Sequence, residues 1–228
     1  MKSLPKEPNV LVDTYTRAVR RFKEDGIVRG STHLLLKLTS KFVRYNCIFF
    51  FTNSKNEPLS SGAVSKLIGV VVDQASRKDI VRFEYCRLRD RAQYRRKAYE
   101  GLDRLRRGDI CFLAKHDGRL IAKAWTTMAD TWFISELETD ESIGPESITI
   151  FDCATIPEYR GKRVFPLILR NIITKYPDRR KVIYCEKRNL SSRRAIEHDF
   201  TLEKKLYFFK ILGVSFRWSG QKQQAVPT

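Results

Sequence analysis

Apolar residues recur at helical spacing in two long stretches of the chain. The first runs from Thr14 to about Phe42, and the breaks at Gly26 and Gly30 favour two short helices over one. The second spans residues 77–107 and stops at Gly108, with apolar positions at Leu88, Ala92, Ala98, Tyr99, Leu102 and Leu105. The pattern predicts helical structure over both stretches.

Strand-like runs lie between and after these stretches. Asn46–Thr52 is rich in Ile and Phe, and Leu67–Val72 is a shorter apolar run. The polar segment between them contains Pro58 and Gly62, which predicts a loop.

The chain after Gly108 predicts a hairpin followed by an acidic loop. Asp109–Lys115 and Arg119–Thr127 flank an Asp-Gly pair, which is typical of a tight hairpin turn. Thr131–Leu137 is a further strand candidate. Residues 136–146 are expected to form an exposed loop that carries five acids: Glu136, Glu138, Asp140, Glu141 and Glu146.

Strand and helix then alternate. Ser147–Ile156 predicts a strand, a helix begins near Val164, and Lys181–Glu186 predicts a second strand. A strand–helix–strand crossing of this length favours a parallel, right-handed connection. The whole pattern predicts a mixed α/β domain built in layers.

Three parts are expected along the chain. Residues 1–45 form a basic helical extension packed on the domain, residues 46–218 form the domain itself, and residues 219–228 form a flexible tail. The longest hydrophobic stretch, at 47–51, is too short to span a bilayer, and the first ten residues lack the apolar run of a signal peptide. We expect a cytoplasmic protein that can lie at the periphery of a membrane.

The chain is strongly basic. It has 44 Lys and Arg against 26 Asp and Glu, a formal net charge of +18, which attracts nucleic acid, an anionic membrane surface or a phosphate-rich ligand. Residues 14–44 hold eight basic against two acidic residues, and residues 77–107 hold twelve against five, interleaved with aromatic residues. Each segment also fits a simpler interpretation, a helix with a solvated basic face.

The five cysteines and three histidines do not predict a metal site. No Cys-x-x-Cys pair occurs, and no histidine stands at metal-ligand spacing beside a cysteine. Cys111, Cys153 and Cys185 fall inside apolar, strand-like runs, so we expect buried, reduced thiols and therefore a reducing compartment. Cys153 has a second interpretation, a contact with an acceptor substrate.

Residues 148–200 contain a candidate anion site. A strand is followed by the basic turn Arg160-Gly161-Lys162-Arg163, which opens the helix near Val164. The first turn of a helix offers unpaired N–H groups and the positive end of the dipole, so this turn suits a pyrophosphate.

This segment resembles the coenzyme A-binding half of the GNAT superfamily of N-acyltransferases. Pro157-Glu158-Tyr159-Arg160-Gly161-Lys162 matches the opening of the family's pyrophosphate loop, and Asn189 and Ser192 match its later Asn-x-x-Ser segment. The hairpin at 109–127 is similar to the family's central hairpin, and the resemblance covers roughly residues 109–212. It implies a GNAT-like, mainly antiparallel twisted sheet flanked by helices.

The resemblance also implies the cofactor and the residues that bind it. The cofactor is acetyl-CoA or another acyl-CoA, and no metal is involved. The expected cofactor-binding residues are Ala154, Thr155, Ile156, Arg160, Gly161, Lys162, Arg163, Val164, Asn189 and Ser192.

The sequence departs from the family at the positions that matter for catalysis. The two small residues of the family's loop fall at Arg163 and Phe165, and the tyrosine that many members use as general acid appears as Ile196. For the general base we considered the acidic loop 136–146 and Asp152, a carboxylate in an apolar strand whose burial is expected to raise its pKa. Asp152 also fits a salt-bridge partner of a nearby arginine. Tyr184 and Tyr207 are the candidate acids.

The expected function is transfer of an acetyl group to the primary amine of a small molecule such as an amino sugar. The alternatives are a non-catalytic GNAT fold or a basic protein that binds nucleic acid or a membrane surface. An acidic carrier protein is a further partner, because the excess of positive charge suits an acidic acyl carrier. A homodimer is compatible with the sequence.

Overall fold

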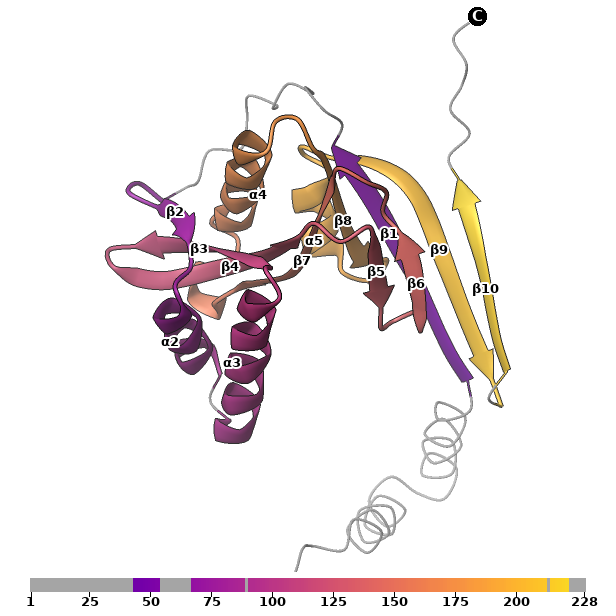
Figure 1. The fold of residues 1–228 in the computed structure, drawn as a ribbon, viewed down its shortest axis with the longest axis horizontal. Coiled ribbons are helices and arrows are strands. Elements are labelled where there is room, and N and C mark those ends of the chain that lie inside the picture. Colours follow the sequence, from indigo (N-terminus) through magenta and orange to yellow (C-terminus); the bar gives the residue numbers. More distant parts are fainter. Residues whose placement is uncertain (1–42, 54–66, 89, 213, 222–228) are drawn as a thin grey trace, which may run out of the picture. The chain divides into compact units, whose positions relative to one another are not determined.

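The computed structural model describes residues 43–53, 67–88, 90–212 and 214–221 (Figure 1). The helices expected within 14–42 lie outside these residues, as does the tail beyond Gln221. The loop expected over 53–65 also lies outside them except for Asn53, which ends a strand. The described chain divides into a main unit, residues 46–207 with 217–221, and a small unit, residues 43–45 with 208–216. The site described below lies wholly in the main unit.

The structure is built on one eight-stranded sheet. Its order is β10-β9-β1-β8-β7-β4-β3-β2. The strands are β1 (Val43–Asn53), β2 (Val71–Gln74), β3 (Ile110–His116), β4 (Arg119–Thr127), β7 (Ser147–Thr155), β8 (Arg180–Glu186), β9 (Thr201–Ile211) and β10 (Val214–Gln221). β7 and β8 are parallel, whereas the β1–β8, β2–β3, β3–β4 and β4–β7 pairs are antiparallel. The mixed, mainly antiparallel sheet expected from the sequence is confirmed.

The β3–β4 hairpin has the predicted turn. Asp117 (φ 48°) and Gly118 (φ 71°) both adopt left-handed backbone conformations, as the two-residue turn that matches strand twist requires. The short strand expected at Leu67–Val72 is shifted, because residues 67–70 form a turn and β2 begins only at Val71.

The helical stretch at 77–107 is a hairpin of two helices, α2 (Arg77–Arg87) and α3 (Arg91–Arg106). α2 begins with a capping box in which Ser76 and Asp79 bond reciprocally, and Asp90 caps the start of α3. The chain thus leaves the helical conformation between Arg87 and Arg91 without a glycine or proline, and the Asp90 cap starts the second helix. Ala92 and Tyr99, expected on the apolar face, are exposed.

The acidic stretch 136–146 is not an open loop. β5 (Thr131–Ile134) and β6 (Thr139–Ser142) pair as a separate two-stranded sheet, with Phe133 opposite Asp140. Leu137 and Ile143 are buried beside this hairpin. These two apolar residues anchor the segment, and Glu136, Glu138 and Glu141 are half-buried whereas Asp140 and Glu146 are exposed.

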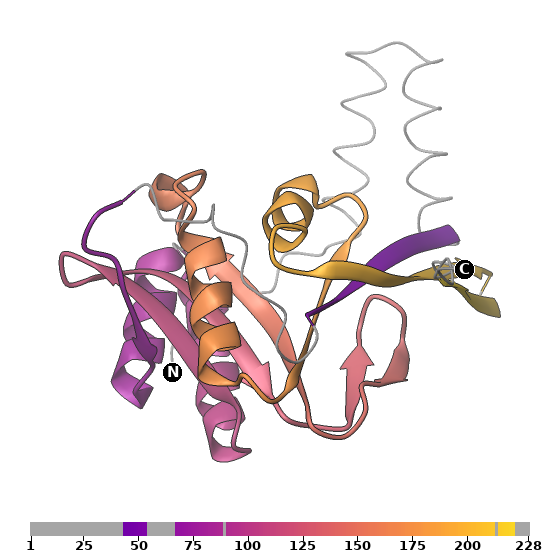
Figure 2. The same ribbon diagram turned by 90° about the horizontal axis from the view of Figure 1, so that it is seen from above.

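Helices cover both faces of the β2–β3–β4–β7 part of the sheet (Figures 1 and 2). α4 (Val164–Lys175) packs on one face through Ile168, Leu169, Ile172 and Ile173, and α5 (Leu190–Ile196) contacts α4. α2 and α3 pack on the other face, where the fully buried Trp125 meets α3 at Gly101. A Cβ added at Gly101 would lie 2.7 Å from a side-chain carbon of Ile80, so the close approach of α3 requires glycine.

Candidate active site

The parallel strands β7 and β8 separate halfway along their length. Their pairing begins at Ser147–Arg180 and ends at Ile150–Ile183. Beyond that point β7 continues along β4 to Thr155, and β8 continues along β1 to Glu186. The two inner edges therefore no longer pair with each other beyond Ile150 and Ile183, and this separation is called the β7–β8 opening below.

A β-bulge on β7 marks the start of the opening. Trp125 of β4 pairs with Phe151, whereas Lys123 pairs with Ala154, so the two residues Asp152 and Cys153 face one residue of β4. Asp152 takes the left-handed conformation of this bulge at φ 42°. Ala154 and Thr155, two of the expected cofactor-binding residues, follow the bulge at the open edge.

The basic turn after β7 leads directly into α4. Pro157–Tyr159 form a 3-10 turn, η1, and the N–H of the buried Ile156 donates to the Ile121 carbonyl oxygen at 2.9 Å. Gly161 takes a positive φ of 72°, and nothing lies within 4 Å of where its Cβ would be. The backbone is therefore open to a ligand at this turn.

α4 begins at an N-terminus that suits an anion. Arg163 is its N-cap, and among the described residues no side-chain hydrogen bond caps this end. Val164 and Phe165 supply the N–H groups of the first turn, because Pro166 at the third position has none. Arg160 is exposed and donates from Nε to the Thr155 carbonyl oxygen at 3.3 Å, and Lys162 lies over the Tyr159 ring at 4.7 Å.

Arg163 explains a departure from the family's loop. Its φ of 59° and ψ of 24° are left-handed, a conformation that glycine adopts without cost. The position that carries a small residue in the family thus has a backbone conformation here that favours glycine, and Arg163 adopts it at a cost in strain.

Asn189 and Ser192 lie at the start of α5, just after the open end of β8. Asn189 is the N-cap of this helix, and its Oδ1 accepts from the Ser192 N–H at 3.2 Å. Ile196, which stands where many family members have an acidic tyrosine, is buried. Asn189 therefore has a structural role in the capping of α5, and Ser192 contributes its backbone to it.

Asp152 is held in a network of charges. Its Oδ2 lies 3.0 Å from Lys123 Nζ and also accepts a hydrogen bond from Arg104 of α3. Lys123 Nζ lies 2.6 Å from Oε1 of the buried Glu84 on α2. Glu84 in turn pairs with Arg87 at 2.7 Å.

The pKa expected for Asp152 was wrong in direction. Burial does raise it, but Lys123 and Arg104 together outweigh burial, so the pKa of Asp152 lies below its ordinary value of 3.8. The carboxylate is fully ionised at neutral pH and is a weak base. The salt-bridge interpretation of Asp152 is confirmed.

Tyr184 lies on β8 just past the point where the strands separate. Its hydroxyl oxygen accepts a hydrogen bond from Trp132 Nε1 at 3.2 Å, and its ring stacks on Phe50. Burial, assisted by the negative charge of Glu136, raises the pKa of Tyr184, whereas the Trp132 bond lowers it. The hydroxyl therefore keeps its proton at neutral pH. Tyr207, the other candidate acid, stacks on Trp218.

Cys111 and Cys185 are buried as expected, whereas Cys153 is half-buried and Cys86 is exposed. All five cysteines are free, and burial raises the pKa of Cys111 to about 12 and that of Cys185 to about 11. Burial also raises the pKa of Cys153, so its thiol is protonated and is a poor nucleophile. Within the described residues no group of three or more His, Cys, Asp or Glu side chains is placed to hold a metal ion. None of the described helices has both the length and the apolar character needed to cross a bilayer.

Sequence reasoning missed the partners of Asp152. Lys123 shares the buried face of β4 with Trp125, and a lysine on a buried strand face is a signal for a paired charge. Glu84 and Arg104 were counted among the solvated charges of residues 77–107. The helical spacing of apolar residues does not by itself show which charged side chains of a basic helix are buried.

Comparison with known proteins was informative only at the level of structure. No family model and no curated protein sequence matches the chain. A conserved protein of unknown function from Staphylococcus epidermidis superposes with a TM-score of 0.55 and 10% identity over 94% of this chain and 71% of its own. A GNAT-family acetyltransferase from Colwellia psychrerythraea has a TM-score of 0.51 and 14% identity, over 73% of this chain and 57% of its own.

A third similar structure is a GCN5-related glucosamine N-acetyltransferase region of a fungal multi-domain GH3 β-N-acetylglucosaminidase. Its TM-score is 0.53 at 12% identity, and the match covers 82% of this chain and 23% of the fungal one. The chain thus spans less than two thirds of the Colwellia and fungal proteins. These similarities show that the chain has the GNAT fold. The separation of β7 from β8 and the bulge on β7 are features of its sheet.

Proposed function

We propose that this protein is an acyl-CoA-dependent N-acyltransferase that acetylates the primary amine of a small molecule. The observation that carries the proposal is the separation of β7 from β8 after Ile150–Ile183. The N-terminus of α4, which no side-chain hydrogen bond caps among the described residues, follows β7 along the chain after the basic turn. An extended edge beside an anion-binding turn suits an elongated ligand with a pyrophosphate at one end.

The residues present fit acyl-CoA. Gly161 and the first N–H groups of α4 would hold the pyrophosphate, and Arg160 and Lys162 add positive charge. The open edge of β7 at Ala154 and Thr155 would pair with the amide groups of the pantetheine arm. When bound, acyl-CoA supplies an activated thioester carbonyl.

Tyr184 is the proton donor in this proposal. The Trp132 N–H occupies one lone pair of the hydroxyl oxygen, which leaves the O–H free to donate. A raised pKa keeps the proton in place until negative charge develops on the leaving sulfur.

Glu136 is the proposed proton acceptor. Its negative charge is among those that raise the pKa of Tyr184, so the carboxylate is within electrostatic reach of that hydroxyl. The Ser135 hydroxyl donates to its Oε2 at 3.1 Å and orients the carboxylate. Asp152, the other acid considered, is neutralised by Lys123 and Arg104 and instead fixes the bulge.

An amino sugar is the acceptor class we favour. The support is the similarity to the fungal glucosamine N-acetyltransferase region, which extends over 82% of this chain. The half-buried acids of the β5–β6 hairpin add negative charge that would attract a protonated amine.

The test is a thiol-release assay with acetyl-CoA and glucosamine, on wild type, Tyr184→Phe and Glu136→Gln. We expect each variant to lose a factor of about one hundred in kcat, the lower end for removal of a general acid or base. Tyr99→Phe, on an exposed tyrosine of α3, is the matched control and should leave kcat unchanged. Equal rates for wild type and Tyr184→Phe would remove Tyr184 from the mechanism.

The alternative is a GNAT fold that binds acyl-CoA without catalysis. The position of the Tyr184 hydroxyl favours the enzyme, because an O–H that can donate lies just past the point where β7 and β8 separate. Binding of acetyl-CoA with no thiol release across a panel of amino sugars and polyamines would decide for the alternative.

A further inference from the structure

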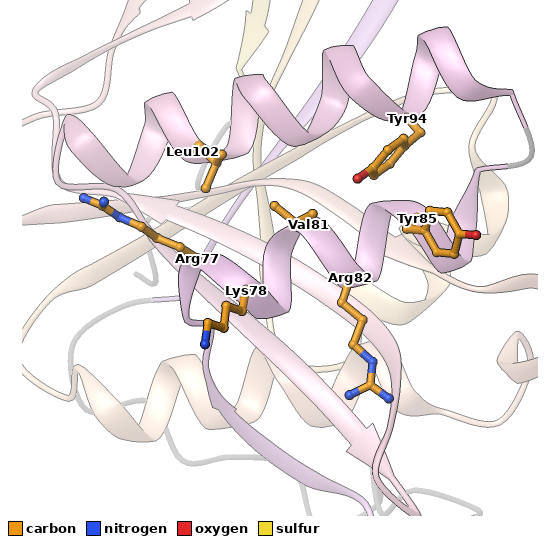
Figure 3. Close-up of a pocket in the computed structure, with 7 residues that line it drawn as sticks. All are labelled: Arg77, Lys78, Val81, Arg82, Tyr85, Tyr94 and Leu102. Carbon is orange, nitrogen blue, oxygen red and sulfur yellow. The ribbon is translucent and has the colours of Figure 1, made fainter.

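A groove runs between α2 and α3 on the side of the helical hairpin that faces away from the sheet. It consists of two adjoining cavities of about 480 Å³ and 710 Å³ that share Val81, Tyr85, Tyr94 and Leu102. Figure 3 shows Val81 and Leu102 pointing into the space between the two helices, with Tyr94 reaching down from α3. The groove is distinct from the opening between β7 and β8.

The floor of the groove is apolar. Val81, Leu88 and Leu102 are only half-buried there, although aliphatic side chains on a helical hairpin are normally covered. Tyr85 and Tyr99 are each 69% exposed along the groove. Exposed tyrosines over an aliphatic floor are typical of a protein interface.

The rim of the groove is cationic, and its basic residues differ from the others of the hairpin in having no salt-bridge partner among the described residues. The described basic residues of α2, α3 and the C-cap of α3 that lie outside the groove all form salt bridges: Arg87, Arg96, Lys97, Arg104, Arg106 and Arg107. None of those lining the groove lies within 4.0 Å of a carboxylate of the described chain: Arg77, Lys78, Arg82, Arg91 and Arg95.

No acid lines the groove, although Asp79 of α2 is near enough to Arg82 for that cation to help lower the pKa of its carboxyl. Lys78 and Arg82 leave α2 on the side away from α3 and flank the apolar floor (Figure 3). Arg77, Lys78 and Arg82 line one of the two cavities, and Arg91 and Arg95 line the other. All five are exposed, and an anionic partner would complement their charge.

We infer that this groove is the docking surface for an acidic partner protein that presents an amphipathic helix. The apolar face of such a helix would cover Val81, Leu88 and Leu102, and its acids would pair with the arginines of the rim. An acidic carrier protein that delivers an acyl chain has this chemistry. The inference does not depend on the proposed catalytic residues.

A nucleic acid fits the groove less well. Binding of single strands relies on open aromatic faces on which bases stack. Tyr94 is instead packed edge to face against Tyr85, with ring centroids 5.5 Å apart, and the floor between them is aliphatic. A helix with leucines at every third or fourth position would fill this floor, whereas a sugar–phosphate chain would leave it uncovered.

The test measures the fluorescence anisotropy of a labelled peptide of about five helical turns that carries Glu on one face and Leu on the other. A scrambled peptide of the same composition and a single-stranded oligouridylate are the comparison probes. The groove variants are Arg82→Gln/Arg95→Gln and Tyr85→Ala, all at exposed positions. The matched control, Arg106→Gln/Arg107→Gln, loses the same two charges outside the groove.

We expect the amphipathic peptide to bind at least about tenfold more tightly than the scrambled one, and each groove variant to weaken it about tenfold, with the control unchanged. Equal weakening by the control, or equal binding of the scrambled peptide, would mean that only the net charge acts and would overturn the inference. Tighter binding of the oligouridylate, lost in the groove variants, would assign the groove to nucleic acid instead.

Discussion

Lys123 Nζ lies 2.6 Å from Glu84 Oε1 and 3.0 Å from Asp152 Oδ2, so one buried ammonium group joins helix α2 to the bulge of β7. The Lys123 side chain is 5% exposed and that of Glu84 only 1%. The bulge opens the strand edge to which the cofactor is proposed to bind. The helical hairpin therefore supports the site through a charge pair rather than through apolar packing alone.

Lys123→Met should destabilise the fold by about 3 kcal/mol, because removal of one partner leaves a buried carboxylate without its cation. Glu84→Met/Lys123→Met should recover most of this loss, since neither charge then remains. Lys97→Met, which breaks an exposed pair with Glu100, should cost less than about 1 kcal/mol. Urea unfolding of the four proteins measures these differences, and a double variant no more stable than Lys123→Met would show that the pair is not the source of the loss.

The stability that Asp152 contributes should depend on pH in a defined direction. Its pKa in the folded state is below 3.8, so folding favours the ionised form. The contribution is complete above the unfolded value and is lost as the pH falls through the folded one. The difference in unfolding free energy between wild type and Asp152→Asn should be constant above about pH 5 and shrink below 3.8. A difference that grows on acidification would contradict the lowered pKa.

The layered fold could be predicted from the sequence because its elements have strong local signals. The Asp117-Gly118 turn fixes the β3–β4 hairpin, and the apolar stripe around Ile168 and Ile172 fixes α4. The loop at 160–163 was identified because a basic turn before a helix has a clear chemical use. These signals depend on residues adjacent in the chain.

The charge network could not be predicted in the same way. Asp152 meets Arg104, 48 positions earlier, because α3 lies against this part of the sheet, and it meets Lys123, 29 positions earlier, because β4 pairs with β7. Burial alone predicts a raised pKa for such a carboxylate, and only the two cations reverse it. The apolar pair Leu137 and Ile143, which turns the expected acidic loop into the β5–β6 hairpin, is a tertiary effect of the same kind.

Arg163 offers a test of backbone strain in the candidate site. Arg163→Gly and Arg163→Ala both remove the side chain, but only glycine relieves the left-handed conformation at φ 59°. The glycine variant should be more stable than the alanine variant by about 1 kcal/mol. Thermal unfolding of the two proteins at one pH measures this difference. Equal midpoints would show that the turn is not strained.

Cys86 should be the first cysteine to react with iodoacetamide in the native protein. It is exposed, whereas burial raises the pKa of Cys47, Cys111 and Cys185. Peptide mass mapping after brief labelling at pH 8 should find modification at Cys86, with the others labelled only after unfolding. Early labelling of Cys153 would instead point to an activated thiol at the bulge.

The measurement that tests the account most directly is calorimetric titration of the protein with acetyl-CoA. We predict saturable binding by wild type, binding at least about tenfold weaker for Arg160→Ala/Lys162→Ala, and no change for Arg106→Ala/Arg107→Ala, which loses the same charge on the exposed end of α3. No heat of binding by wild type up to roughly millimolar acetyl-CoA would contradict the assignment of the β7–β8 opening and the α4 N-terminus as an acyl-CoA site.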